Sequence, residues 1–226
     1  MKLDDVIPWG RSFKEYERMF DLGKDDLSIR ILGCGDGPAS FNSQGTELGC
    51  SIVSADPIYA FNAEQIEQRI LACYEEVKEK VRQQRENYVW TCFTNPEELA
   101  TARMRAMREF LSDYESGKRD GRYVTAALPT LPFENGEFDL SLCSHFLFLY
   151  SDHFDLAFHL ASMRELLRVS REVRVFPLFS LNGIRSPHID SVLSDLSSEG
   201  YDVSIRTVDY EFQRGGNQMM SVQRKA

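Results

Sequence analysis

The chain has 226 residues, 42% hydrophobic and 27% charged, a balance typical of a soluble globular protein with one α/β domain. Its formal net charge of −9 argues against an extended nucleic-acid surface, because phosphate binding depends on clustered Lys and Arg. No apolar run could span a bilayer and the first residues lack a signal-peptide core, so we expect a cytoplasmic protein without a membrane partner. The cysteines form no Cys-x-x-Cys pair, so we expect reduced thiols and no metal site.

The first expected element is a helix near the N-terminus. Ser12 and Glu15 have the spacing of a capping box, and aromatic residues then recur at helical spacing before Gly23, a predicted C-terminal cap. We therefore expect an N-terminal helical segment within residues 1–27, ahead of the first strand.

A glycine-rich turn follows the first predicted strand, residues 28–32. Gly33, Gly35 and Gly37 stand at alternate positions, where the absence of a Cβ lets the backbone turn sharply and approach a ligand. Pro38 then occupies the predicted first residue of a helix, since its φ is already suited to that position. The predicted unit is a strand, a glycine turn and a helix.

An acidic residue ends the next predicted strand, residues 50–55. In open α/β sheets an acid at the place of Asp56 accepts hydrogen bonds from ribose hydroxyls, so the two segments together predict a nucleoside pocket. A dinucleotide fingerprint would need its third glycine where this chain has Pro38, and a phosphate-binding loop would need Gly-Lys-Ser/Thr after the glycines. Both of these alternatives are therefore disfavoured.

Two helices are expected before the third strand, where a doubly wound sheet usually needs only one. The spacing predicts helices over residues 62–86 and 95–117, joined by an aromatic connector at residues 88–93. We interpret residues 62–120 as a helical insertion that forms a substrate cover, with aromatic side chains that offer a dimer surface.

The remaining elements alternate between strands and helices and end in two strands. Further strands are predicted at residues 122–127, 138–145, 172–177, 202–208 and 217–222, with helices over residues 154–169 and 186–200. The fold expected is α/β, a doubly wound, mostly parallel sheet of seven strands with antiparallel closing strands.

The chain resembles the class I S-adenosylmethionine (SAM) methyltransferases in two motifs. One is the glycine loop with Asp56, and the other is Leu131-Pro-Phe-Glu-Asn-Gly-Glu-Phe-Asp-Leu, which is similar to the "LPF, turn, FD" segment of that family. The resemblance implies a Rossmann-like methyltransferase fold, a single domain over residues 1–226, and SAM as cofactor.

The resemblance also implies a set of cofactor-binding residues. The wall of the methionine and ribose pocket would comprise Gly33, Cys34, Gly35 and Gly37; Asp56 would clamp the ribose; Pro57, Ile58 and Leu128 would lie at the adenine; Ser144 and His145 would lie near the methyl group. The family often has acids where this chain has Ile31 and Ala127. Arg11, with Tyr16 nearby, is the predicted replacement, its guanidinium meeting the SAM carboxylate.

Methyl transfer needs alignment first and a base only for some acceptors. His145 and His153 are the candidate bases because imidazole titrates near neutral pH, although a purely structural role for His145 remains an alternative. We expect a small-molecule acceptor, because the chain has Cys-Ser-His-Phe in place of an Asn-Pro-Pro-Tyr/Phe motif and lacks a basic tail. The alternatives are an RNA or protein methyltransferase and a SAM-binding protein without transfer activity.

Overall fold

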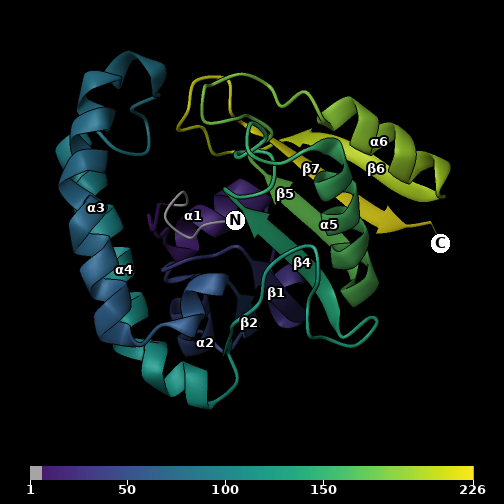
Figure 1. Cartoon of the computed structure of the whole chain (residues 1–226), viewed down its shortest axis with the longest axis horizontal. Coiled ribbons are helices and arrows are strands. Elements are labelled where there is room, and N and C mark those ends of the chain that lie inside the picture. Colours follow the sequence, from purple (N-terminus) through teal and green to yellow (C-terminus); the bar gives the residue numbers. More distant parts are fainter. Residues whose placement is uncertain (1–6, 226) are drawn as a thin grey trace.

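The computed structural model describes residues 7–225 and contains one seven-stranded sheet (Figure 1). The strands are β1 (Arg30–Cys34), β2 (Ser51–Ala55), β3 (Tyr123–Val124), β4 (Phe138–Ser144), β5 (Ser170–Phe176), β6 (Tyr201–Thr207) and β7 (Gln218–Arg224). Their order is β3-β2-β1-β4-β5-β7-β6, and only β7 runs antiparallel to its neighbours β5 and β6. The predicted doubly wound, mostly parallel sheet is therefore confirmed.

Helices cover both faces of this sheet. They are α1 (Phe13–Phe20), α2 (Phe41–Glu47), α3 (Ala63–Gln83), α4 (Pro96–Arg119), α5 (Leu156–Val169) and α6 (Ile189–Ser198). Short 3-10 helices lie at Asp26–Ser28, Pro57–Ala60 and Arg85–Asn87. Within residues 7–225, no helix is both long and apolar enough to cross a membrane.

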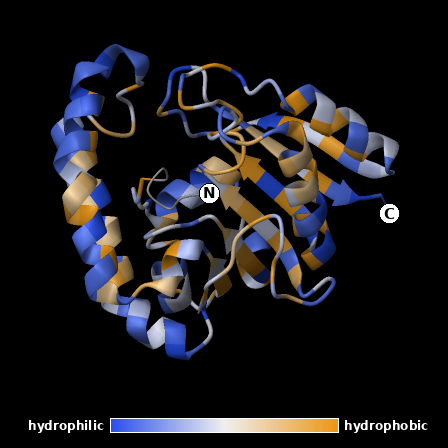
Figure 2. Ribbon diagram, in the orientation of Figure 1, coloured by the Kyte–Doolittle hydropathy of each residue, from blue (hydrophilic) through white to orange (hydrophobic). Residues whose placement is uncertain are grey.

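The central strands β1, β4 and β5 bury both of their faces, so successive residues enter different cores. Leu32 and Val173 belong to the core under α5 and α6, whereas Ile31 and Leu140 belong to the core under α1 and α2. Figure 2 shows the corresponding hydrophobic segments along the strands in the middle of the molecule. The glycine loop therefore starts from a strand that is held on both sides.

The predicted insertion is present between β2 and β3. Helices α3 and α4 pack on each other as a pair beside the sheet, beyond α2 (Figure 1). The connector between them does not form an outward aromatic face, because the rings of Tyr88, Trp90 and Phe93 lie 4.6–6.1 Å from the ring of Phe212 in the same chain. These connector rings thus contribute to internal packing, and a homodimer through the insertion stays a prediction.

Two predicted helix boundaries are wrong. The capping box at Ser12 is present, but α1 ends at Phe20 and its C-cap is Asp21 with φ of 50°, not Gly23. Asp is one of the few residue types besides Gly that adopt this left-handed conformation, because its short polar side chain can form local hydrogen bonds. Helix α2 begins after Ser40 rather than at Pro38, since the amide of Gly37 donates to Asp56 instead of entering a helix.

Candidate cofactor and acceptor cavity

One large cavity of about 1210 Å³ opens at the carboxyl ends of the parallel strands. Its lining contains most of the residues that the resemblance implied: Arg11, Tyr16, Cys34, Gly35, Gly37, Asp56, Pro57, Ile58, Leu128, Ser144 and His145. Gly33 and His153 are not among the lining residues, and His153 is exposed in a turn after β4. Tertiary structure thus brings residues from five separate segments to one site.

The glycine loop is held against the end of β2 by Asp56. Its Oδ2 accepts the Gly37 amide at 2.9 Å and its Oδ1 accepts the Ile58 amide at 2.8 Å. Burial raises the pKa of Asp56, whereas the two hydrogen bonds lower it; burial has the larger effect, and the pKa is about 6. Each carboxylate oxygen keeps a further lone pair for a ligand hydroxyl in the cavity.

A second carboxylate, Asp36, lines the cavity and was not among the predicted site residues. Tyr16 donates its hydroxyl to Oδ1 at 2.8 Å, and Ser54 donates to Oδ2 at 2.7 Å. Burial raises the pKa of Asp36 to about 7. The signal for this residue was an acidic side chain between two glycines of the loop.

Two positions of the loop require glycine, each for a different structural reason. A Cβ on Gly33 would lie 1.9 Å from Oδ2 of Asp36, so this position must be empty for the carboxylate to fold back over β1. Gly35 has φ of 74°, and a Cβ there would also meet Phe146 at 2.9 Å. Gly33 therefore leaves space for the side chain of Asp36 and does not itself line the cavity.

Arg11 enters the cavity wall from the segment before α1. One of its terminal nitrogens donates to the Trp9 carbonyl at 3.0 Å, whereas its Nε is buried and has no hydrogen-bond partner among the described residues. Burial and the nearby Arg103 guanidinium lower the pKa of Arg11 to about 10. An anionic ligand group would compensate this desolvated cation.

His145 follows the last residue of β4 and lies beside Ser144. It has φ of 51°, its amide donates to the Phe176 carbonyl at 2.7 Å, and its Nδ1 lies 3.0 Å from the Ser144 hydroxyl. Burial and the charge of Arg11 hold the pKa of His145 well below its ordinary value. The imidazole is therefore uncharged at neutral pH.

No cluster of three or more metal-binding side chains lies together in residues 7–225. The polar side chains of the cavity lining carry carboxylates, one imidazole, hydroxyls, thiols, carboxamides and guanidinium or ammonium groups, a set suited to an organic ligand with both charges.

No family model matches the chain. It is similar to the uncharacterized protein MJ0045 of Methanocaldococcus jannaschii, with 35% identity over 225 residues and 99% of each chain covered. Among solved structures it is similar to the PH0226 protein from Pyrococcus horikoshii OT3, with TM-score 0.51, 10% identity, and 94% of this chain and 89% of that chain covered. It is also similar to the mitomycin 7-O-methyltransferase MmcR, with TM-score 0.50, 10% identity and coverages of 94% and 54%. These two structural similarities confirm the Rossmann-like methyltransferase fold.

Proposed function

The chain belongs to the same family as MJ0045 and has the Rossmann-like methyltransferase fold, and we propose that it transfers the methyl group of SAM to a small-molecule acceptor. The observation that carries this proposal is the gathering of the glycine loop, Asp56, Ser144 and His145 around one cavity. The whole chain, residues 1–226, would act as a single methyltransferase domain.

The residues present fit both ends of SAM. Asp56 would accept the ribose hydroxyls, with Pro57, Ile58 and Leu128 at the adenine. The buried, unpartnered Nε of Arg11 supports pairing with the SAM carboxylate. Asp36, on the loop that would carry the methionine portion, is the acid suited to the ammonium group.

The transfer itself is a displacement at carbon. When bound, SAM supplies a methyl group on a cationic sulfur; an acceptor lone pair forms the new bond while sulfur keeps the electron pair of the broken one. Ser144 and His145 would border the acceptor atom, and His145, uncharged at neutral pH, would take the proton that a hydroxyl acceptor releases. Most of the acceleration would come from alignment within the cavity walls.

The volume and the charge of the cavity disfavour two alternatives, SAM binding without transfer and an RNA acceptor. Its volume of about 1210 Å³ exceeds the roughly 300–1000 Å³ of a site for one drug-sized ligand, which supports transfer to a second molecule over SAM binding alone. Apart from Arg11, the basic residues of the lining are Arg69 and Lys80, and the chain as a whole has a net charge of −9, which disfavours an RNA acceptor.

Titration calorimetry with SAM and S-adenosylhomocysteine tests the binding half of this proposal. We expect Asp56→Asn to weaken both ligands by about 10-fold or more, because charge-assisted hydrogen bonds to the ribose become neutral ones. Asp25→Asn is the matched control, since Asp25 is exposed and its side chain caps no helix. Failure of the wild-type protein to bind either ligand would refute the proposed function.

The transfer half is tested by His145→Asn, because Asn tolerates the positive φ of this position while removing the imidazole. We expect binding of S-adenosylhomocysteine to stay within about 2-fold and turnover on a panel of small hydroxyl acceptors to fall by roughly 10²-fold or more. Unchanged turnover in this variant would assign His145 a structural role only.

A further inference from the structure

Part of the cavity lining comes from residues other than those predicted to bind the cofactor, and we call the space that they line the outer lobe. Its walls come from α3, from residues 149–158 after β4, and from residues 210–216 between β6 and β7. None of these segments belongs to the glycine loop or to the end of β2, where the predicted cofactor residues gather. Because the whole cavity is larger than one drug-sized ligand requires, the outer lobe offers room for a second ligand.

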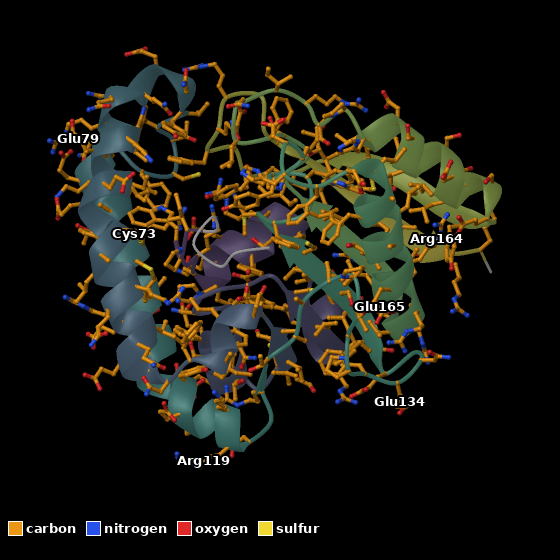
Figure 3. All side chains as sticks on the ribbon, viewed as in Figure 1. Cys73, Glu79, Arg119, Glu134, Arg164 and Glu165 are labelled. Carbon is orange, nitrogen blue, oxygen red and sulfur yellow. The ribbon has the colours of Figure 1, made fainter. Side chains whose placement is uncertain are left out.

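Helix α3 gives one of its faces to the outer lobe. The lining residues recur every three or four positions, as one face of a helix does: Arg69, Ala72, Cys73, Val77, Lys80, Val81 and Gln84. In Figure 3, Cys73 lies on the side of α3 toward the body of the molecule, whereas the exposed Glu79 projects from the outer side. The insertion thus builds one wall of the outer lobe from a single face of α3.

The rest of the outer lobe is apolar and largely aromatic. Its lining includes Tyr88, Leu149, Tyr150, Phe154, Phe158 and Phe212. The rings of Tyr88 and Phe212 are stacked with centroids 4.6 Å apart, which closes this wall between the insertion and the loop after β6. Aromatic walls favour flat apolar ligands, because ring faces and edges attract one another.

The charged side chains that line the outer lobe are all positive. Its only charged lining residues in the described chain are Arg69 and Lys80, while the cavity carboxylates Asp36 and Asp56 lie at the glycine loop. Lys80 is exposed and pairs with Glu76 at 2.6 Å. Arg69 is half-buried over the ring of Phe61, 4.1 Å from its centroid, and has no ion-pair partner within residues 7–225. Arg69 is therefore the cation available to a ligand.

Resting on the proposed function, we propose that the acceptor is a small molecule with a flat apolar body and an anionic group that pairs with Arg69. SAM carries a single carboxylate, which Arg11 would hold, so the cofactor cannot also satisfy Arg69. The planar guanidinium binds carboxylate or phosphate through two parallel hydrogen bonds, and the ring of Phe61 supports it from one face. Both kinds of anion belong to this class of acceptor.

Calorimetric titration of the S-adenosylhomocysteine-loaded protein with naphthoate and with neutral naphthamide tests this assignment. The two probes share a ring and differ in charge. We expect naphthoate to bind about 10-fold more tightly than naphthamide, and this preference to disappear in Arg69→Gln, because the charge-assisted pair is lost. Naphthyl phosphate in place of naphthoate distinguishes the two anions.

Arg119→Gln is the matched control, since Arg119 lies at the end of α4 and does not line the cavity (Figure 3). It should keep the wild-type preference. An unchanged preference in Arg69→Gln, equal binding of both probes to the wild type, or no binding of either would overturn the inference. If S-adenosylhomocysteine itself does not bind, the proposed function fails, and the same titrations on the free protein still decide whether Arg69 selects an anion.

Discussion

The position of one acid distinguishes this site from the pattern that the resemblance predicted. Ile31 stands where the family often has an acid, and it is fully buried in the core under α1 and α2. Gly33 lies on the same face of β1, two residues on, and the carboxylate of Asp36 fills the space that its missing Cβ leaves. The chain thus supplies from its loop an acid that the strand does not carry.

Asp36 should make ligand binding depend on pH. The pKa of Asp36 is about 7 in the folded protein, against an ordinary value of 3.8 in the unfolded chain. Between these two pH values the folded protein keeps a proton that the unfolded chain has released. The contribution of Asp36 to the free energy of unfolding therefore falls as the pH rises from about 3.8 to about 7. A ligand ammonium favours the ionised carboxylate. We expect the affinity for S-adenosylhomocysteine to rise by up to about 10-fold per pH unit from about pH 5.5 and to level off above about pH 7.

Calorimetry across this pH range checks the expectation, with Asp36→Asn as the test and Asp25→Asn as the control. Asp56, with pKa of about 6, adds a smaller rise of the same sign at lower pH. The pKa of His145 is already well below its ordinary value, so His145 stays uncharged through most of the range. A profile in Asp36→Asn as steep as that of the wild type would contradict the role of Asp36.

At the scale of elements, a buried polar network joins three segments around the cavity. Glu15 on α1 pairs with Arg103 on α4, and the Tyr210 hydroxyl donates to Glu15 at 2.8 Å. Arg103 also lies over the ring of Phe93, 5.5 Å from its centroid. The charge of Arg103 holds the pKa of Glu15 at about 2 despite burial. The network fixes α1 and α4 on either side of Tyr210, which lines the cavity.

Breaking this network should be strongly destabilising. Arg103→Met leaves the carboxylate of Glu15 buried without its cationic partner, so we expect the free energy of unfolding to fall by about 3 kcal/mol or more in urea denaturation. The double variant Glu15→Gln, Arg103→Met should recover part of this loss. Arg105→Met, at an exposed position on the same helix, should change the free energy by less than about 0.5 kcal/mol. A similar small effect of Arg103→Met would show that the pair is dispensable.

At the scale of the whole molecule, the insertion is bound to the sheet as well as to itself. Asp113 on α4 accepts two hydrogen bonds from Arg122 just before β3, at 2.6 and 2.7 Å. The Tyr114 hydroxyl donates toward the carbonyls of Tyr59 and Phe61 after β2, at 2.9 and 2.8 Å. These contacts join the insertion to the strands that precede the predicted cofactor residues, so we expect both parts to unfold together.

Differential scanning calorimetry should therefore record a single transition that the ligand shifts. S-adenosylhomocysteine at about 100 times its Kd stabilises the native state by about 2.7 kcal/mol, which for a chain of this size raises Tm by roughly 5–10 °C. Asp56→Asn at the same ligand concentration should shift less. Two separate transitions, or a shift confined to one of them, would mean that the insertion folds apart from the sheet.

The sequence alone determined the architecture, and it predicted residues that line the centre of the cavity. Glycines at fixed spacing, caps such as Ser12 with Glu15, and runs of apolar residues act within a few neighbours, so the order of elements and the positions of Gly35 and Asp56 could be predicted. The end of α1 at Asp21 was not predicted, because several neighbouring residues can form the cap of a helix.

Only the tertiary structure decided which distant side chains meet. Asp36 folds back over Gly33 to reach Tyr16 and Ser54, and Arg103 reaches Glu15 from another helix, contacts that no local spacing encodes. The outer lobe likewise exists because one stripe of α3 faces the loop after β6. Burial then sets the charge of these groups, and burial is a property of the assembled fold.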